Sequence, residues 1–416
     1  MEKQQLTTIV TDQQRLLRGR RRYVPRDIEP QVKQHLESGF ISVISGLRRT
    51  GKSTLLQHIR KQHASRYYLD FDDERLADFQ LEDFQTLIEI FLELYGPSDY
   101  FFFDEIQNVK GWERFIRRLH NEGKKVLITG SNANLLSKEL GTHLTGRYLQ
   151  STLYPFSFRE FLRFFNVDIT DTHSTQGKVQ LIKQFKRYVK LGGLPEYLRT
   201  KNLDIIKLLY ENILYRDVVA RYNIDNEKPL RDLVRFCASN PGKEISFSKL
   251  AQHIGVKSGT TVKEYLTYLE NVYLSFLVPR HSWSVKQQLL ANKKIYMIDT
   301  NLIQQIGFHF SEEEGRLLEN TVFIELKRRN LEIFYFRDKH ECDFVIQTGN
   351  QISQAIQVTY SLTDENYERE VNGALEAMEK FNLNEGLILT LEQAKTITID
   401  SKTIHVKPVW QWLLNN

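Results

Sequence analysis

The chain has 416 residues, with 41% hydrophobic and 26% charged residues and a formal net charge of +5. Because a single hydrophobic core stops growing at roughly 250–300 residues, we expect about two to four domains of ordinary globular composition. No apolar run approaches the ~20 residues that span a bilayer, and residues 1–5 do not begin a signal peptide. These features predict a cytoplasmic protein with no membrane partner, and the two cysteines, Cys237 and Cys342, exclude a disulfide framework.

The first informative element is residues 46–53, which match the pattern G-x-x-x-x-G-K-[ST] between a strand-like run and a helix-like run. Glycines at both ends let the backbone fold around phosphate oxygens, and the helix N-terminus supplies amide donors and positive potential. We therefore predict that the following residues bind ATP: Gly46, Leu47, Arg48, Arg49, Thr50, Gly51, Lys52, Ser53 and Thr54. The Lys52 ammonium would reach the outer phosphates, and the Ser53 hydroxyl would hold Mg²⁺.

The next element is an apolar strand over residues 100–103 that ends directly in Asp104 and Glu105. Placing two carboxylates directly after a buried strand costs free energy unless they interact with a cation or another charged group. Asp104 is predicted to hold Mg²⁺, and Glu105 is predicted to orient and polarise the water that attacks ATP.

A third core strand is predicted over residues 125–129, and Ser131 and Asn132 follow it. Either side chain could touch the attacking water or the last phosphate, although both residue types also end strands as ordinary turn formers. Arg147 precedes the alternating run 148–153, where it could reach the nucleotide of a neighbouring subunit as an arginine finger. That role needs a homo-oligomer at least when ATP is bound, and an ordinary exposed arginine is the alternative.

These motifs resemble those of bacterial and archaeal AAA+-type P-loop ATPases that carry a C-terminal nuclease-like domain of unknown function. The resemblance rests on the phrases ISGLRRTGKSTLL, FFFDEIQNVKGWERFIRRLH and VLITGSNANLLSKELGTHLTGR. Four later phrases extend it over nearly the whole chain: LYPFSFREFL at 153–162, LGGLPEYL at 191–198, LYRDVVARY at 214–222 and KKIYMIDTNL at 293–302. It implies an α/β fold with an ATPase core, a helical lid, a winged helix and a fold similar to the PD-(D/E)XK nucleases.

Composition and periodicity place the boundaries of these parts. Helical spacing of apolar residues dominates after residue 153, and Pro241-Gly242 marks a break. The expected domains are an ATPase core (1–153), a helical lid (154–240), a winged helix (241–285), a linker (286–311) and an α/β nuclease-like domain (312–416).

The winged helix is expected from a helix over 246–254, a turn at Gly255, a second helix over 260–269 and a wing strand over 274–279. The second helix begins with residues that could meet DNA phosphates or base edges, namely Lys257, Ser258, Thr260, Thr261 and Lys263. Winged helices also serve as protein-contact modules, so a protein partner remains open.

The last hundred residues follow the order helix, three strands, helix. Metal-dependent cleavage would need Glu319 and Asp343 as ligands, with an E-x-K on the third strand. This chain has Gln357 and Thr359 there, so it lacks one carboxylate and the lysine, although Gln357 could still offer a carbonyl oxygen. We predict a degenerate site used for binding.

Together these readings predict a Mg²⁺-dependent, ATP-hydrolysing protein that is associated with DNA. Two other classes stay open, a nucleotide-gated scaffold for protein partners and an active metal-dependent nuclease.

Overall fold

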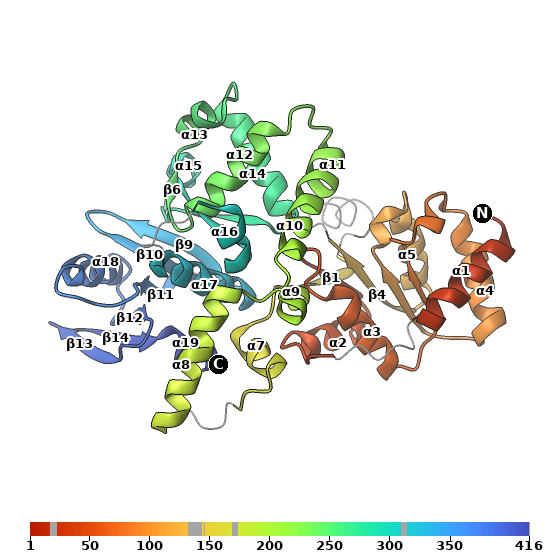
Figure 1. Ribbon diagram of the computed structural model, residues 1–416, viewed down its shortest axis with the longest axis horizontal. Helices are drawn as coiled ribbons and strands as arrows, with labels where there is room; N and C mark the ends of the chain where they lie inside the picture. The colour runs from red at the N-terminus through yellow and green to blue at the C-terminus, as the bar shows by residue number, and fades with distance from the viewer. Residues whose placement is uncertain (17–22, 132–143, 145, 169–173, 309–313, 416) are drawn as a thin grey trace. The chain divides into compact units, whose positions relative to one another are not determined.

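The computed structural model describes residues 1–416 except 17–22, 132–143, 145, 169–173, 309–313 and 416. The chain divides into two compact units, Met1–Leu153 and Tyr154–Asn416 (Figure 1). In the described ranges, no helix has the length and apolarity needed to cross a bilayer.

The first unit is built on a parallel sheet of five strands in the order β2-β3-β4-β1-β5. The strands are β1 (Ile41–Ser45), β2 (Tyr68–Asp70), β3 (Tyr100–Asp104), β4 (Lys125–Gly130) and β5 (Tyr148–Thr152). Parallel strands need crossover connections, which place helices on both faces and bury the strands on both sides. The predicted α/β core with a parallel sheet is confirmed.

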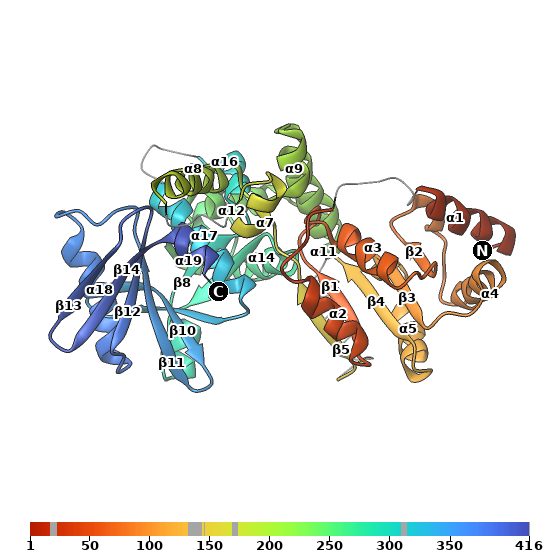
Figure 2. The ribbon, with the colours of Figure 1, turned by 90° about the horizontal axis from the view of Figure 1, so that it is seen from below.

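Alternation along β3 shows how the two faces are filled. Phe101 and Phe103 join the core formed with α1, α4 and α5, whereas Phe102 joins the core formed with α2 and α3 on the other face (Figure 2). These helices are α1 (Lys3–Leu16), α2 (Glu29–Glu37), α3 (Lys52–Gln62), α4 (Asp83–Tyr95) and α5 (Trp112–Asn121), and two short 3-10 turns are η1 (Glu74–Leu76) and η2 (Ile106–Asn108). Since the strands are parallel, the carboxyl ends of β1, β3 and β4 meet at one edge of the sheet, where ligands of open α/β sheets bind.

The second unit begins with helices, as the spacing of apolar residues predicts. They are α7 (Phe158–Phe164), α8 (Thr175–Leu191), α9 (Pro195–Thr200), α10 (Asp204–Glu211), the π-helix η3 (Asn212–Val219), α11 (Ala220–Tyr222) and α12 (Lys228–Ser239). A capping box starts α7, because the Ser157 hydroxyl accepts from the Glu160 amide and the Glu160 carboxylate accepts from the Ser157 amide.

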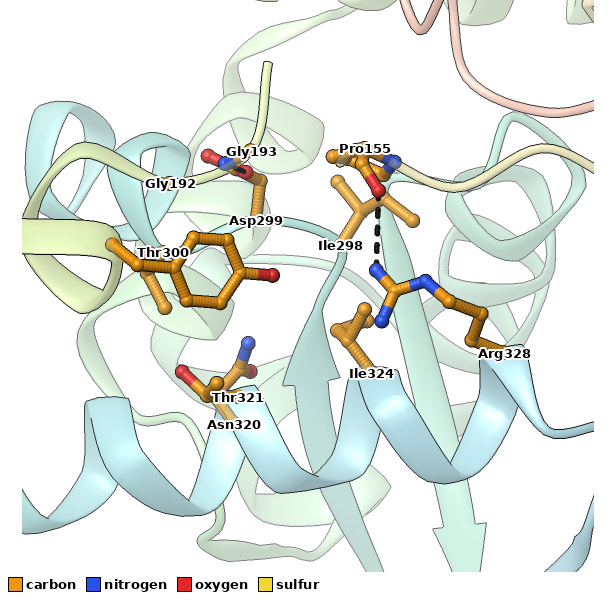
Figure 3. Close-up of a pocket in the computed structure, with 11 residues that line it drawn as sticks. Pro155, Gly192, Gly193, Ile298, Asp299, Thr300, Asn320, Thr321, Ile324 and Arg328 are labelled. Carbon is orange, nitrogen blue, oxygen red and sulfur yellow. Dashed lines mark hydrogen bonds between the residues drawn. The ribbon is translucent and has the colours of Figure 1, made fainter. Parts of the chain in front are cut away.

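The turn after α8 is a structural junction of distant segments (Figure 3). The Gly193 amide donates to Asp299 Oδ2 at 2.7 Å, and the Gly193 carbonyl accepts from the Phe156 amide at 2.7 Å. A Cβ on Gly193 would come within 2.4 Å of the Phe156 carbonyl oxygen, so this close approach requires glycine. Arg328 Nη2 donates to the Pro155 carbonyl at 3.1 Å. The pocket that they line holds about 20 Å³, enough for one water molecule and too small for a ligand.

The segment predicted as a linker, residues 286–311, is not one. It contains β8 (Lys293–Met297), which lies between β6 (Glu244–Ile245) and β7 (Ser275–Pro279) in a three-stranded antiparallel sheet, and α16 (Thr300–Ile306). The same part holds α13 (Phe247–Ile254), α14 (Gly259–Asn271) and α15 (Val285–Leu290), and α13 packs on α14 (Figure 1). The prediction failed because the short run around β8 has no partner strand within its own segment.

The C-terminal sheet has six strands in the order β13-β14-β12-β11-β10-β9. The strands are β9 (Glu332–Arg337), β10 (Glu341–Thr348), β11 (Gln351–Val358), β12 (Glu385–Thr390), β13 (Lys395–Ile399) and β14 (Lys402–Pro408), and the helices are α17 (Glu314–Arg328), α18 (Tyr367–Lys380) and α19 (Val409–Leu414). Strands β9, β10 and β11 are antiparallel neighbours, and β12 and β14 continue the sheet parallel to β11. The predicted order of helix, three strands and helix is therefore present from α17 to α18.

Candidate functional site

The loop from Gly46 to Gly51 connects β1 to α3 at the carboxyl edge of the first sheet. Gly46 has a φ of 140°, and a Cβ there would lie 2.3 Å from the Leu153 carbonyl oxygen, so no other residue fits. Gly51 caps α3 in the left-handed conformation, with a φ of 99°. The loop therefore leads directly into the N-terminus of α3, where the first amides have no partner within the helix and can bind an anion.

The Lys52 side chain is buried and lies across this loop. Its ammonium donates to the carbonyls of Gly46 and Leu47, each at 3.1 Å, and lies 3.8 Å from Glu105 Oε1. The Thr50 carbonyl accepts from Arg26 Nη1 at 2.8 Å, so the buried side chain of Arg26 holds the loop through its backbone. Sequence reasoning missed Arg26, because no pattern ties it to the loop.

Asp104 ends β3 and is 1% exposed. Burial and the charge of Glu105 raise the pKa of Asp104 to about 6, against the lowering effect of the Thr129 and Ser53 hydroxyls. Asp104 is buried beside the exposed Ser53 hydroxyl, so a carboxylate and a hydroxyl oxygen lie together at this edge. Asp104 and Ser53 therefore fit Mg²⁺, which proteins hold through one or two carboxylates together with phosphates and water.

Glu105 follows directly in the left-handed conformation, with a φ of 48°. Burial raises the pKa of Glu105, but the charges of Lys52 and Arg48 outweigh burial and hold that pKa below its usual value. Its backbone amide donates to Thr129 Oγ1 at 3.0 Å, and the Thr129 hydroxyl in turn donates to Asp104. Glu105 is thus ionised and oriented, as a group that polarises water must be.

Two groups near this edge were missed in the sequence. Asp70 at the end of β2 is paired in register with Asp104, and burial together with the charge of Asp104 raises the pKa of Asp70 to about 7. Thr129 is fully buried and joins the ends of β3 and β4 through its hydroxyl. The sequence contained two signals for these residues. Asp70 ends a strand, and Thr129 lies at the end of β4.

Three more residues of the first unit were predicted to act on the nucleotide, namely Ser131, Asn132 and Arg147. Ser131 is buried directly after β4 and lies close enough to Glu105 to lower its pKa, while Asn132 falls outside the described residues. Arg147 lies before β5, and its carbonyl accepts from the Ile41 amide at the start of β1. The phosphate loop follows the other end of β1, a strand length of about 15 Å away. Arg147 is therefore placed away from the phosphate loop of its own chain.

In the second unit, the predicted DNA-contacting residues gather at the start of α14. Lys257, Ser258, Thr260 and Lys263 are exposed. The Ser258 hydroxyl caps the helix by accepting from the Thr261 amide at 3.4 Å. Serine and lysine at a capped helix N-terminus suit a phosphate.

The three residues of the predicted degenerate site also come together. Glu319 lies on α17, Asp343 lies at a bulge of β10, and Gln357 lies near the end of β11. The Gln357 carbonyl oxygen is already engaged, because it accepts from the Asp343 amide at 3.0 Å, while its amide group donates to Glu370 at 2.6 Å. The Gln357 oxygen thus already accepts one hydrogen bond, and a contact of that oxygen with a metal stays a prediction.

A lysine occupies the centre of this cluster, although the third strand lacks one. Lys294 on β8 is 1% exposed, and its ammonium lies 2.7 Å from Asp343 Oδ1, 2.8 Å from Glu341 Oε1 and 3.2 Å from Glu319 Oε1. Burial lowers the pKa of Lys294, but the charges of Asp343 and Glu319 outweigh burial and hold it well above its usual value. Sequence reasoning missed Lys294, because it lay in the expected linker.

The cluster opens into a cavity of about 560 Å³. Its lining combines the acidic cluster with basic side chains, namely Arg316, Arg337, Lys339, His340 and Arg369. Within the described part of the chain, no group of three or more His, Cys, Asp or Glu residues is arranged to hold a metal ion. In this cluster the Lys294 ammonium lies among the carboxylates of Asp343, Glu341 and Glu319.

The chain is similar to two family models and to a solved structure. Residues 38–162 match the family model described as an AAA domain, and residues 182–311 match a domain of unknown function, DUF8612. A solved Walker-type ATPase of Pyrococcus abyssi, PABY2304, is 17% identical, with a TM-score of 0.44 over 68% of this chain and 96% of that chain.

Relatives match over most of their length. An uncharacterized protein of Haemophilus influenzae is 32% identical over 81% of this chain and 87% of its own. The uncharacterized protein MJ1544 of Methanocaldococcus jannaschii is 36% identical over 94% of this chain and 91% of its own. The chain therefore belongs to the family of MJ1544, and its residues 38–162 match an AAA domain.

Proposed function

We propose that the first unit binds and hydrolyses ATP with Mg²⁺. The observation that carries the proposal is the convergence of Lys52, Ser53, Asp104 and Glu105 at one edge of the sheet, with Glu105 3.8 Å from the Lys52 ammonium. The loop amides and Lys52 would hold the phosphates, and Ser53 and Asp104 would hold Mg²⁺, which neutralises phosphate charge. Glu105 would orient the attacking water. The decisive test is ATP turnover of the purified chain, compared with the variants described in the Discussion.

A second element of the proposal is that Arg147 acts on the ATP of a neighbouring copy. The support is that Arg147 lies beside the amino end of β1, about 15 Å from the loop of its own chain. Arg147→Ala should retain ATP binding and lose at least about 10³-fold in turnover, because an arginine finger contributes 10³–10⁵. The measurement is turnover per chain at increasing protein concentration, which should rise for the unaltered protein.

The control mixes two inactive proteins. Lys52→Ala carries an intact Arg147, so adding it to Arg147→Ala should restore part of the turnover. Turnover that is independent of concentration in a demonstrated monomer would contradict the proposal.

We further propose that the β6–β8 segment is a winged helix that binds DNA through the start of α14. The support is the exposure of Lys257 and Lys263 beside a capped helix N-terminus. Each phosphate contact contributes about 0.9 to the slope of log affinity against log salt. The double variant Lys257→Ala, Lys263→Ala should therefore bind duplex DNA more weakly and lower the slope by about 2. Fluorescence anisotropy over a salt series measures both quantities.

The matched control removes the same charge elsewhere. Lys178 and Lys183 are exposed on α8, and replacing both with alanine should leave the slope unchanged. An unchanged slope in the Lys257, Lys263 variant would reject DNA contact at α14. ATP turnover with and without duplex DNA then shows whether the two units are coupled.

One observation favours a second candidate, a nucleotide-gated scaffold for a protein partner. Around α15, four large apolar side chains are 67–76% exposed, namely Trp283, Val285, Leu289 and Leu290. Clustered exposed apolar side chains are typical of protein contact surfaces. This scaffold would bind ATP and show no effect of DNA on turnover.

We also propose that the C-terminal sheet with α17 and α18 is a nuclease-like fold that binds without cutting. The support is the order of its elements together with the third strand, where Gln357 and Thr359 replace the acidic and basic residues of a cutting site. Plasmid DNA should stay intact with Mg²⁺ or Mn²⁺.

A further inference from the structure

The carboxylates of the C-terminal cluster share one partner, the Lys294 ammonium. An ammonium has three N–H donors, and three carboxylate oxygens surround this one at 2.7 to 3.2 Å, one each from Asp343, Glu341 and Glu319. Every donor is therefore matched by an acceptor. Such charge-assisted bonds are stronger than neutral ones. Burial and the charge of Asp343 raise the pKa of Glu319 to about 8, which reduces the negative charge that the ammonium has to balance near neutral pH.

Two of these carboxylates also accept hydrogen bonds from neighbouring groups. Asp343 Oδ2 accepts from the Val358 amide at 2.9 Å. Glu319 Oε1 accepts from the Tyr296 hydroxyl at 2.6 Å, and its Oε2 faces Gly242, where an added Cβ would lie 2.6 Å away. A divalent cation would need several of these oxygens at about 2.0–2.6 Å, where the ammonium now binds them.

Lys294 also has little freedom to move aside. It lies on β8, the middle strand of the three-stranded sheet, and is 1% exposed. Its ammonium sits 5.9 Å from the centre of the Tyr335 ring. The strand therefore holds a fixed positive charge inside the carboxylate cluster.

We propose that Lys294 is the resident cation of this cluster, in the place that a divalent metal ion takes in a cutting nuclease. The cluster consequently takes no divalent cation while Lys294 is present. The inference rests on the proposed nuclease-like fold and deepens it, because it explains how three carboxylates persist in a domain that binds without cutting. It also ties the β6–β8 sheet to the C-terminal sheet through one buried charge.

The test measures Mn²⁺ binding to the full chain by electron paramagnetic resonance of the free ion, without nucleotide or DNA. Lys294→Met removes the ammonium and leaves the three carboxylates. It should bind one Mn²⁺ per chain more than the unaltered protein, with a Kd on the order of 10⁻⁴ to 10⁻³ M, as for weak carboxylate sites. The added ion should be lost again in Lys294→Met, Asp343→Asn. Lys293→Met is the matched control, because Lys293 is the adjacent residue of β8 and its ammonium instead contacts the Gln288 carbonyl at 3.4 Å.

Two results would overturn the inference. In the first, the unaltered chain binds Mn²⁺ and Asp343→Asn abolishes this binding. The cluster would then take a divalent cation although Lys294 is present. The other is a folded Lys294→Met protein that binds no more Mn²⁺ than the unaltered chain. If Lys294→Met does not fold alone, refolding in Mn²⁺ should restore it, and failure of Mn²⁺ to do so counts against the inference. Loss of DNA binding or of ATP turnover would bear on the proposed function instead, since neither enters this measurement.

Discussion

Glu105→Gln is expected to bind ATP and keep it, whereas Lys52→Ala is expected to bind ATP weakly. The first substitution keeps the size of the side chain and removes the carboxylate that polarises water, so turnover should fall by about 10²-fold or more. The second removes the ammonium that now lies across the loop on the Gly46 and Leu47 carbonyls. Losing its charge-assisted bonds to phosphate should weaken ATP binding by about 10–100-fold.

Lys52→Ala should lose ATP affinity, whereas Glu105→Gln should keep ATP affinity and lose turnover. Nucleotide titration and steady-state turnover on the same preparations separate affinity from chemistry. Lys61→Ala and Glu122→Gln are charge-matched controls, because Lys61 is exposed in the last turn of α3 and Glu122 is exposed after α5. Wild-type turnover by Glu105→Gln would remove Glu105 from the chemistry.

Elements that depend on neighbours along the chain could be predicted well. The strand, loop and helix around Gly46 and Lys52 follow from local apolar patterning and from glycine positions, and β1 and α3 flank the loop as expected. The order β2-β3-β4-β1-β5 could not be predicted, because pairing between strands is decided by contacts far apart in sequence. The same limit hid the pairing of Asp70 with Asp104.

The candidate site in the C-terminal domain shows this limit most clearly. Glu319, Asp343 and Gln357 were expected to meet, and they do, but the lysine that organises them comes from a strand 49 residues before Asp343. A short run such as β8 has no periodicity of its own that would separate it from a linker. Its pairing with β6 and β7 brings Lys294 to the carboxylates.

The position of Arg147 relative to the phosphate loop could be obtained only from the structure. In the sequence, the pattern allowed a nucleotide contact from a neighbouring copy, with an ordinary exposed arginine as the alternative. The structure places Arg147 at the amino end of β5, beside Ile41, while the loop follows the carboxyl end of β1. The parallel register of β1 and β5 makes that separation visible, and the action of Arg147 on another copy stays a prediction.

The second large effect is expected for Gly46→Ala. The Leu153 amide donates to the Ser45 carbonyl at 2.7 Å, so the chain after β5 runs tightly past the start of the phosphate loop. A Cβ on Gly46 would lie 2.3 Å from the Leu153 carbonyl oxygen, at a φ of 140° that other residues rarely adopt. Backbone strain and overpacking together should lower the free energy of unfolding by about 2–5 kcal/mol. ATP affinity should also fall, because the loop must move to relieve the clash.

Gly39 supplies the matched control at the other end of the same strand. Its φ is 83°, and an added Cβ would meet nothing within 4 Å, so Gly39→Ala introduces backbone strain without a clash. That strain should lower the free energy of unfolding by about 1–2 kcal/mol and leave ATP affinity unchanged. Denaturant unfolding and nucleotide titration of both variants give the comparison. Gly46→Ala and Gly39→Ala could instead give the same free energy of unfolding and the same ATP affinity. That result would show that close packing of Leu153 does not determine the shape of the phosphate loop.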